Sequence, residues 1–188
     1  MKRNDRDLVV RLKAKDERAF EKLVKRYEKR VYMIAYGILK NENDAYDATQ
    51  NVFLKVFKYI NNFRETASLY TWIYKITYHV AIDIYRKRKK GSSVEYSEFI
   101  KSDGVTANDL HHNVSSPDSV TENKELSITI ENALSKISES HRTVIILREI
   151  EGLSYTEIAD ILDVSKGTVM SRLHHARLNL QKYLKEHL

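Results

Sequence analysis

Helix-breaking residues are scarce in this chain, since its 188 residues include five glycines and one proline. Glycine and proline supply most of the tight turns that β-hairpins and sandwiches need, and both interrupt helices when they lie inside them. A chain with so few of them favours long helices joined by short connections. The sequence therefore predicts an all-α fold.

Apolar residues recur at helical spacing in three stretches of the first 90 residues, at about residues 16–40, 45–60 and 69–90. Candidate caps between the first two stretches are Asn41, Asn43 and Asp44. In the second stretch, the predicted packing set includes Val52, Phe53, Val56 and Phe57. The third stretch has an inward stripe of Leu69, Ile73, Ile76, Val80 and Ile84.

Residues 91–120 differ from both flanks because they hold the one proline, two of the five glycines and no sustained period. We interpret them as a flexible linker between two small helical domains, residues 1–90 and 121–188. We expect the domains to be separable, because neither flanking set of helices needs the other to complete its apolar stripe. Proteolysis should then cut within the linker.

The second domain is predicted to end in a helix-turn-helix at residues 153–184. A first helix should run from near Thr121 to Ile137, and the next should be capped by Ser138 and ended by Gly152. The short helix of the motif starts with a capping box, Ser154 with Glu157, and Ser165 caps the last helix.

The last helix has an inward stripe of Val169, Leu173, Ala176 and Leu180. The opposite face is centred on Gly167, Ser171 and His174, with Met170 and His175 on its flanks. A polar, short-chained face near a helix N-terminus suits entry into the major groove of DNA. An ordinary helical hairpin with a solvated face is the alternative interpretation.

The charge distribution agrees with a polyanionic partner. The chain has a net charge of +6, but residues 1–90 hold 22 Lys and Arg against 11 Asp and Glu. Lysine-rich, solvated helix faces are the other explanation. Without cysteine, disulfides and thiolate metal sites are excluded. No apolar run approaches the roughly 20 residues that span a bilayer, so we expect a cytoplasmic protein with no direct membrane insertion.

A histidine-based metalloenzyme is a third hypothesis. His111 and His112 lie in the presumed linker, and His174 and His175 occupy adjacent, divergent positions of a helix. Neither pair has the i, i+4 spacing that converges on a metal ion, so we expect no metal site.

Three ordered motifs resemble those of the extracytoplasmic-function (ECF) sigma factors, the two-domain group of bacterial sigma factors. Residues 44–57 are similar to the family's core-polymerase-binding helix, with an acid, an amide and an aromatic at Asp47, Gln50 and Phe53. Residues 63–90 are similar to its promoter-melting segment. Residues 147–172 resemble its upstream-promoter recognition segment.

The resemblance implies a sigma factor that binds core RNA polymerase and directs promoter-specific transcription initiation, under the control of an anti-sigma factor. The N-terminal domain would recognise and open the minus-ten promoter element, and the C-terminal domain would recognise the minus-thirty-five element. No cofactor, metal or catalytic residue is implied, because the polymerase performs the chemistry, so the chain is not expected to be an enzyme. A stand-alone helix-turn-helix regulator is the alternative, in which the motif at residues 44–57 would have no role.

The matched motifs imply three sets of site residues. The residues expected to bind core polymerase are Asp47, Gln50, Asn51 and Leu54. Those expected at minus-ten DNA are Arg64, Tyr70, Trp72, Tyr74, Lys75, Tyr78, His79, Arg86 and Arg88. Those expected at minus-thirty-five DNA are Lys166, Thr168, Met170, Ser171, Arg172, His174 and His175.

Helical phase predicts that Thr71, Tyr74, Tyr78 and Tyr85 point outward beside Lys75, where aromatic rings could stack on unpaired bases. Several residues depart from the family's pattern, among them His174 and His175, around which the family often has an aromatic or basic residue. Asn51 stands where the family usually has Glu, His79 where it has Asn, and Met170 where it often has Arg. We expect His79 to help set minus-ten specificity, because an imidazole presents its donor and acceptor differently from an amide.

Overall fold

The computed structural model describes residues 3–64, 67–92, 129–130 and 132–185, and these form helices and turns without a β-strand. The N-terminal part consists of α1 (Arg3–Lys13), α2 (Glu17–Leu39), α3 (Glu42–Tyr59), the 3₁₀ turn η1 (Ile60–Asn62) and α4 (Leu69–Ser92). The C-terminal part consists of α6 (Glu139–Ile145), the π-helical turn η2 (Ile146–Ile150), α7 (Tyr155–Leu162) and α8 (Lys166–Lys185). The all-α prediction is confirmed.

Side-chain caps start the helices near the residues expected from the sequence. Asp16 accepts from the Ala19 amide at 3.1 Å and starts α2, and Asn41 accepts from the Asp44 amide at 2.9 Å and starts α3. Each such bond satisfies an amide that has no partner inside the helix. Lys40, in the left-handed conformation with φ 52°, ends α2.

The capping box of α7 is present, because Ser154 accepts from the Glu157 amide while the Glu157 carboxylate accepts from the Ser154 amide at 2.9 Å. Ser138 caps α6, and Gly152, with φ 69°, follows the π-helical turn that extends it. The first helix expected in this domain is described only at residues 129–130 and 132–136, which are helical. Its expected start near Thr121 and most of the expected linker lie outside the described residues.

Helix α1 was not expected from the sequence. It buries Leu8, Val9 and Leu12 against α2 and η1. The stripe is short and lies within a charged segment, so periodicity alone gives a weak signal. Packing on α2 supplies the stability that an 11-residue helix lacks on its own.

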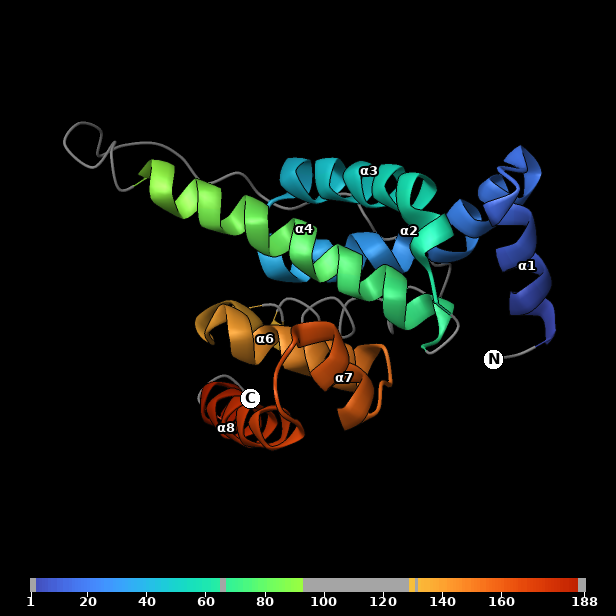
Figure 1. Ribbon diagram of the computed structural model, residues 1–188. Helices are drawn as coiled ribbons and strands as arrows, with labels where there is room; N and C mark the ends of the chain where they lie inside the picture. Colours follow the sequence, from blue (N-terminus) through green and yellow to red (C-terminus); the bar gives the residue numbers. More distant parts are fainter. Residues whose placement is uncertain (1–2, 65–66, 93–128, 131, 186–188) are drawn as a thin grey trace, which may run out of the picture.

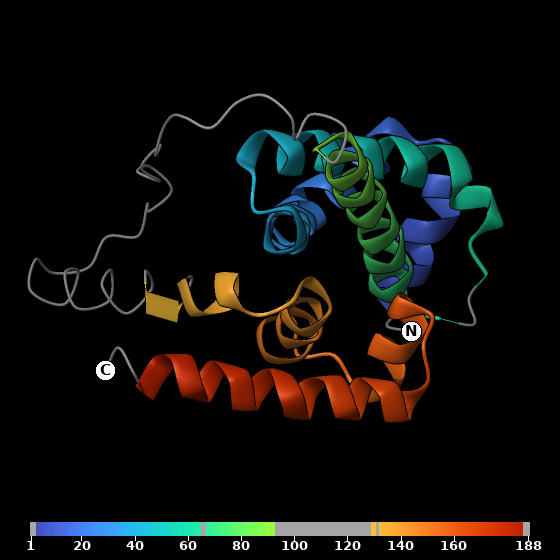
Figure 2. The same ribbon diagram turned by 90° about the vertical axis from the view of Figure 1, so that its left-hand side faces the viewer.

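Figure 1 shows α2, α3 and α4 side by side, with α6, α7 and α8 gathered on one side of them. Figure 2 shows α6 lying between α8 and the N-terminal helices. The buried apolar residues form one continuous cluster that includes members of both parts. The two parts thus share apolar contacts in this structure, whereas the domain limits, their separability and the expectation that neither set of helices needs the other to complete its stripe stay predictions.

Glycine 37 permits a close approach between the two parts. A Cβ atom at this position would lie 2.1 Å from the Ile146 Cδ1 atom. The Gly37 carbonyl also accepts from Arg142 Nη1 at 3.2 Å, and the buried Arg142 guanidinium donates to the carbonyls of Leu134 and Ile137 as well. One guanidinium thus joins the end of α2 to the segment before α6.

Candidate nucleic-acid and protein interfaces

The outer face of α3 presents the expected polymerase-binding residues to solvent. Asp47, Gln50 and Asn51 are exposed, and Leu54 is 66% exposed. On the opposite face, Val52 and Val56 are fully buried. A leucine among short polar side chains is a surface that a protein partner can cover.

The predicted packing set of α3 is wrong at Phe57, because this residue is 42% exposed. Its ring meets that of Phe20 edge-on, with the centroids 5.2 Å apart, and the Lys15 ammonium lies 4.1 Å from its centroid. The helical phase places Phe57 at the boundary between core and surface, where α1 and α2 cover only part of the ring.

The face of α4 that was predicted to point outward is largely covered in the structure. The predicted exposure of Thr71 and Tyr74 is therefore wrong. Thr71 is 3% exposed and Tyr74 is 1% exposed, whereas Tyr78 and Tyr85 are half-buried. The Tyr74 hydroxyl donates to Glu151 Oε2 at 2.8 Å. Burial and then this carboxylate raise the pKa of Tyr74 well above its ordinary value. The cause is tertiary, since the C-terminal domain lies on this face of α4.

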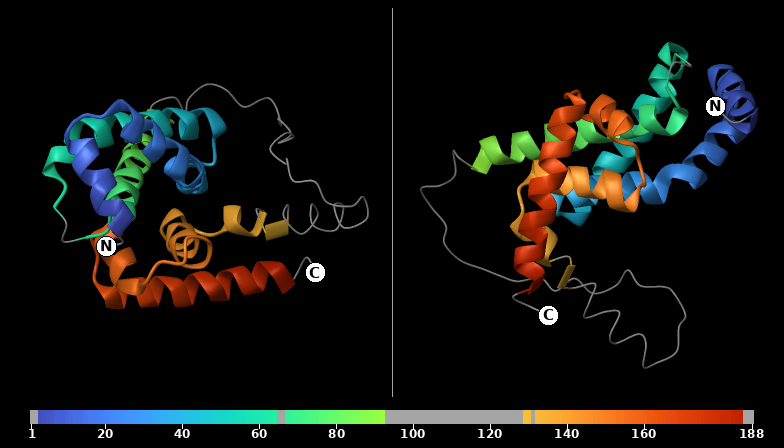
Figure 3. Two further views of the ribbon diagram at one scale, coloured as in Figure 1. Left: turned by 90° about the vertical axis from the view of Figure 1, so that its right-hand side faces the viewer. Right: turned by 90° about the horizontal axis from the view of Figure 1, so that it is seen from below.

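Two further polar contacts join α7 to α4. The Tyr70 hydroxyl donates to Glu157 Oε1, and Lys75 Nζ lies 3.6 Å from Asp160 Oδ1. Figure 3 shows α7 lying against one end of α4. Three residues expected to touch minus-ten DNA, namely Tyr70, Tyr74 and Lys75, therefore contact carboxylates of the C-terminal domain in this structure.

A hollow of about 270 Å³ lies between α3 and α4, and its lining residues are Lys55, Trp72, Lys75, Ile76 and His79. Trp72 and Ile76 offer apolar surface, and the two lysines offer positive charge. Trp72, Lys75 and His79 were expected from the sequence as site residues, whereas Lys55 was not. Nothing in the sequence marks Lys55, because only the crossing of α3 over α4 brings it to the hollow.

The orientation of the His79 ring is fixed by a hydrogen bond, since Nδ1 lies 2.7 Å from the Lys75 carbonyl oxygen. A carbonyl oxygen only accepts, so the proton of this bond belongs to Nδ1. In the neutral ring, Nε2 is then left as an acceptor. A neutral His79 ring with this hydrogen bond therefore presents an acceptor, and not a donor, at its exposed edge.

The arginines before α4 and at its basic end differ in how free their side chains are to contact phosphates. Arg64, in the loop before α4, and Arg86 are exposed. Arg88 instead donates to Asp44 Oδ2 and to the Leu39 carbonyl, each at 2.9 Å. Its guanidinium holds α4 against the turn between α2 and α3, which leaves it less available to phosphates than its neighbours.

The N-terminal half of α8 presents most of the expected minus-thirty-five residues. Lys166, Ser171, His174 and His175 are exposed, and Met170 is 51% exposed. The inward stripe is confirmed, because Val169, Leu173 and Ala176 are buried and Leu180 packs against the core.

Two of the expected minus-thirty-five residues, Thr168 and Arg172, are half-buried. Thr168 forms a cap with Ser165, whose Oγ accepts from the Thr168 amide at 3.0 Å and lies 2.8 Å from the Thr168 hydroxyl. The cap thus occupies the Thr168 hydroxyl and fixes the start of α8.

Histidines from two helices gather beside this surface. The His175 ring lies 5.5 Å from that of His174 and 6.4 Å from that of His141 on α6, between centroids. Burial, followed by the nearby His175 and Arg172, lowers the pKa of His141. Among the residues that the structure describes, no group of three or more His, Asp or Glu side chains could hold a metal ion. His111 and His112 lie outside the described residues.

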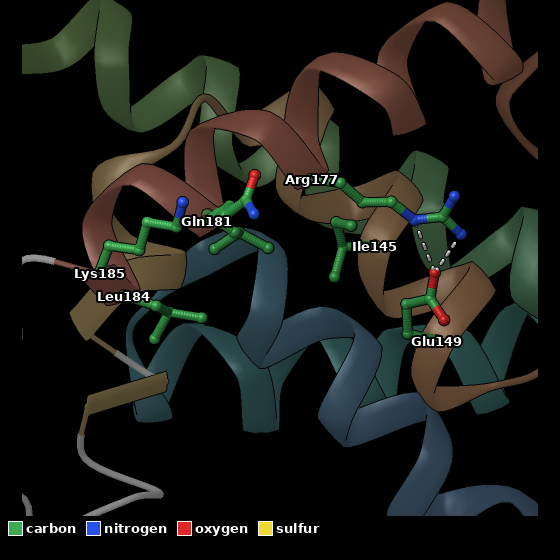
Figure 4. Close-up of a pocket in the computed structure, with 7 residues that line it drawn as sticks. Ile145, Glu149, Arg177, Gln181, Leu184 and Lys185 are labelled. Atoms are coloured by element: carbon green, nitrogen blue, oxygen red, sulfur yellow. Dashed lines mark hydrogen bonds and ion pairs between the residues drawn. The ribbon is translucent and has the colours of Figure 1, made fainter. Parts of the chain in front are cut away.

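A larger groove, of about 770 Å³, follows the C-terminal half of α8 (Figure 4). Ile145, Leu180 and Leu184 give it an apolar lining, and at one end Arg177 Nη2 pairs with Glu149 Oε1 at 2.6 Å. The groove was not expected from the sequence. It occupies a different half of α8 from the candidate DNA-contacting residues.

Comparison with protein families gives two matches in chain order, to sigma-70 region 2 at residues 23–91 and to sigma-70 region 4 at residues 127–180. The sequence is 31% identical to the RNA polymerase sigma-H factor of Pseudomonas aeruginosa over 185 residues, covering 96% of this chain and 93% of that protein. It is also 31% identical to the ECF RNA polymerase sigma factor SigW of Bacillus subtilis, covering 95% of each chain. The chain belongs to the ECF family of RNA polymerase sigma factors. This sigma factor is thus a transcription initiation factor that acts with RNA polymerase.

Solved structures share the fold of this sigma factor. The sigma factor RpoE of Bartonella quintana, solved in complex with the anti-sigma factor NepR, superposes with a TM-score of 0.71 at 24% identity, covering 90% of this chain and 98% of that one. CnrH, solved in complex with the cytosolic domain of CnrY, superposes with a TM-score of 0.68 at 22% identity, covering 98% and 99%. No helix of the described residues is both long and apolar enough to cross a membrane.

Proposed function

We propose that this sigma factor recognises the minus-ten element in the hollow between α3 and α4. The observation that carries the proposal is the set of residues gathered there, Trp72, Ile76, His79 and the two lysines. An unstacked base needs an apolar or aromatic surface for its faces and a polar group for its edge, and the adjoining backbone needs cations. Lys55 and Lys75 supply the cations, and Arg64 and Arg86 would contact phosphates further along the bound DNA strand.

His79 gives this hollow a preference among bases. Its Nδ1 atom is engaged by the Lys75 carbonyl, so a neutral His79 offers Nε2 as an acceptor. At the exocyclic position at C6 or C4, adenine and cytosine carry amino groups that donate to such an acceptor, whereas guanine O6 and thymine O4 only accept. The ring N–H groups of guanine and thymine and the guanine N2 amino group also donate, so the preference requires His79 Nε2 to meet this exocyclic position. We propose that His79 favours adenine or cytosine.

The minus-thirty-five element is proposed to bind at the N-terminal half of α8. Ser171, His174 and His175 would approach base edges, with Met170 beside them, and Lys166, Thr168 and Arg172 would lie nearer to phosphates. The exposed, short polar side chains of this half support the proposal, since a recognition helix contacts bases through its N-terminal residues.

Core polymerase is proposed to bind the exposed face of α3 at Asp47, Gln50, Asn51 and Leu54. An anti-sigma factor is proposed as a second protein partner, as for the RpoE structure solved with NepR. We assign no catalytic role to this chain, because polymerase performs the chemistry, and we place it in the cytoplasm with its polymerase. The proposed domains are residues 1–90 and 121–188, joined by residues 91–120.

Promoter binding requires the two domains to separate. Elements 25 base pairs apart lie about 85 Å apart along B-form DNA. In this structure α7 packs directly on α4, and Tyr70 and Tyr74 contact Glu157 and Glu151. We infer that the C-terminal domain leaves α4 when the sigma factor joins polymerase and promoter, which frees the tyrosines for DNA.

The test is transcription by core polymerase and this protein from a promoter library randomised across both elements. We expect His79→Ala to relax base preference in the minus-ten element alone, and His174→Ala to relax it in the minus-thirty-five element alone. His79→Asn, which restores a donor beside the acceptor, should admit guanine or thymine. Loss of one good base contact corresponds to about 1–3 kcal/mol of discrimination.

Lys166→Ala is the matched control for these histidine variants. It removes a proposed phosphate contact, so it should lower transcription from all sequences alike and reduce the salt dependence of binding. If His79→Ala and His174→Ala also lower all sequences alike, neither residue reads bases. Failure of the unaltered protein to support any initiation would contradict its role as a sigma factor for the polymerase tested.

A further inference from the structure

Helix α1 lies outside the region 2 match, which begins at residue 23. It nevertheless packs tightly, because Leu8, Val9 and Leu12 are each buried in the N-terminal core. Its neighbours are α2 and η1, the turn that leads into the loop before α4. The contacts of α1 with this turn suggest a function beyond filling the core.

The turn between α1 and α2 has a defined backbone geometry next to two lysines, Lys13 and Lys15. Lys15 adopts the left-handed conformation with φ 60°, the Asp16 amide donates to the Arg11 carbonyl at 3.1 Å, and the Lys15 amide donates to the Leu12 carbonyl at 3.0 Å. This pair of bonds is that of a Schellman motif. Arg11 Nε also pairs with Asp16 Oδ2 at 2.9 Å. The end of α1 is thus held in one geometry.

Both lysines donate to main-chain carbonyls near the end of α3. Lys15 Nζ donates to the Phe57 carbonyl and lies over the ring of the same residue. Lys13 Nζ donates to the Phe63 carbonyl at 3.1 Å, across 50 residues of sequence. Cations are favourable at the C-terminal end of a helix, where carbonyls lack intrahelical partners.

Phe63 connects this bond to the proposed base-binding hollow. Its amide donates to the Ile60 carbonyl at 3.1 Å and its carbonyl accepts from Lys13, so both polar groups of its backbone are tied. Its ring is 2% exposed and lies 5.3 Å from the ring of Trp72, between centroids. Trp72 in turn lines the hollow beside Lys55, Ile76 and His79.

We propose that Lys13 is a positioning residue for minus-ten recognition, which holds Phe63 so that Trp72 keeps the shape of the hollow. This inference rests on the proposed function of the hollow. Lys13 itself does not line the hollow, so its effect must pass through Phe63 and Trp72. A residue that only stabilised the fold would weaken folding without changing the Trp72 environment of the folded protein.

The chain offers a direct probe, because Trp72 is its only tryptophan. The emission spectrum and acrylamide quenching of Trp72 would be measured in the full-length protein, alone and with single-stranded DNA that carries the minus-ten sequence preferred in the library experiment. Lys13→Met removes the donor and keeps an unbranched chain. Lys13→Arg keeps a donor. Lys22→Met removes a cation from an exposed position of α2 and controls for lost charge.

We expect Lys13→Met to make Trp72 more accessible to quencher and to weaken binding of the preferred strand roughly threefold to tenfold, the range of one hydrogen bond. Lys13→Arg should restore both values, and Lys22→Met should match the unaltered protein in quenching. Circular dichroism would confirm that the variants stay helical.

Three results would overturn the inference in distinguishable ways. Trp72 could respond to DNA in the unaltered protein while the Lys13→Met variant shows the same quenching and the same DNA affinity. In that case Lys13 does not position Phe63 or Trp72, and the hollow keeps its proposed function. If Trp72 does not respond to DNA even in the unaltered protein, the hollow is not the base-binding site and the role of Lys13 falls with it. Equal weakening by Lys13→Met and Lys22→Met would assign the effect to charge.

Discussion

At the scale of single residues, the surroundings of His141 disfavour its protonated form. The ring centroids of His141 and His175 are 6.4 Å apart, and Arg172 contributes a further positive charge nearby. Protonation of His141 inside this cluster opposes the charge of its neighbours and its partial burial. Both effects favour the neutral ring in the folded protein.

The first prediction is an acid-sensitive contribution of His141 to stability. Its pKa in the folded protein lies below the ordinary 6.5, so the folded state binds fewer protons than the unfolded state. The contribution is complete above pH 6.5 and is lost as the pH falls through the lower folded pKa. Urea unfolding at pH 7.5 and 5.5 should show His141→Gln losing less stability than the unaltered protein. An equal loss in both proteins would contradict this assignment.

At the scale of elements, the crossing of α2 over η2 depends on the absence of a side chain at Gly37. Ile146 is 4% exposed and its Cδ1 atom occupies the space that a Cβ atom would need. Packed interiors accommodate extra atoms only by moving neighbours. Here the neighbour is Ile146, which is held between the N-terminal and the C-terminal part of the molecule.

The second prediction is that Gly37→Ala destabilises the protein, because overpacking costs about 1–3 kcal/mol and alanine regains only up to about 1 kcal/mol over glycine within a helix. Ile146→Val removes the clashing methyl group and should cost about 0.5–1.5 kcal/mol alone. The double variant should be more stable than the sum of the two costs predicts, as measured by urea unfolding. Strict additivity would show that the two residues do not meet.

Gly167→Ala is the control for this pair. A Cβ atom there lies 3.7 Å from its nearest neighbour, Ser165 Oγ, which is an ordinary contact. Alanine is favoured over glycine within a helix by up to about 1 kcal/mol. The same substitution should therefore leave stability unchanged or raise it at Gly167 while lowering it at Gly37.

At the scale of the whole molecule, charged and polar groups of α4 face carboxylates of the C-terminal domain. Tyr74 contacts Glu151, Tyr70 contacts Glu157, and Lys75 lies near Asp160. Lys75 is half-buried and Asp160 is exposed, so their attraction is screened by salt and weak. An interface of this kind can hold the domains together and still open when polymerase and DNA bind.

The third prediction concerns this opening. Glu151→Lys with Asp160→Lys places new positive charge opposite Tyr74 and Lys75, so the domains should separate in the free protein. The chain has no cysteine, and Lys25→Cys with Lys182→Cys would carry a fluorescent donor and acceptor at exposed positions. Energy transfer should fall in the double-lysine variant. Glu149→Lys, which breaks only the pair with Arg177 inside the C-terminal domain, should leave it unchanged.

The same experiment can fail in an informative way. If energy transfer in the double-lysine variant equals that of the unaltered protein, these carboxylates do not hold the domains together. If transfer is already low without the substitutions, the closed arrangement is not the main state in solution. High salt should lower transfer in the unaltered protein, since it screens the pair between Lys75 and Asp160.

The sequence alone determined the helices after α1 in outline, and it determined the family. The caps at Asn41, Ser138, Ser154 and Ser165 start helices where the residue types predicted them, because a cap satisfies amides within a few residues of itself. The inward stripe of α8 followed for the same local reason. Three motifs in order were enough to indicate an ECF sigma factor, which the comparisons with known proteins confirm.

Only the tertiary structure decided which polar faces remain free. Helical periodicity identifies the apolar stripe, but it cannot show that a polar face is covered by a partner with matching hydrogen-bonding groups. Tyr74 was expected to face DNA and instead lies buried against Glu151. Lys55 and Lys13 carry no local signal, since their partners lie in other helices or far along the chain. Their environments arise from crossings between helices, which depend on the packing of the whole chain.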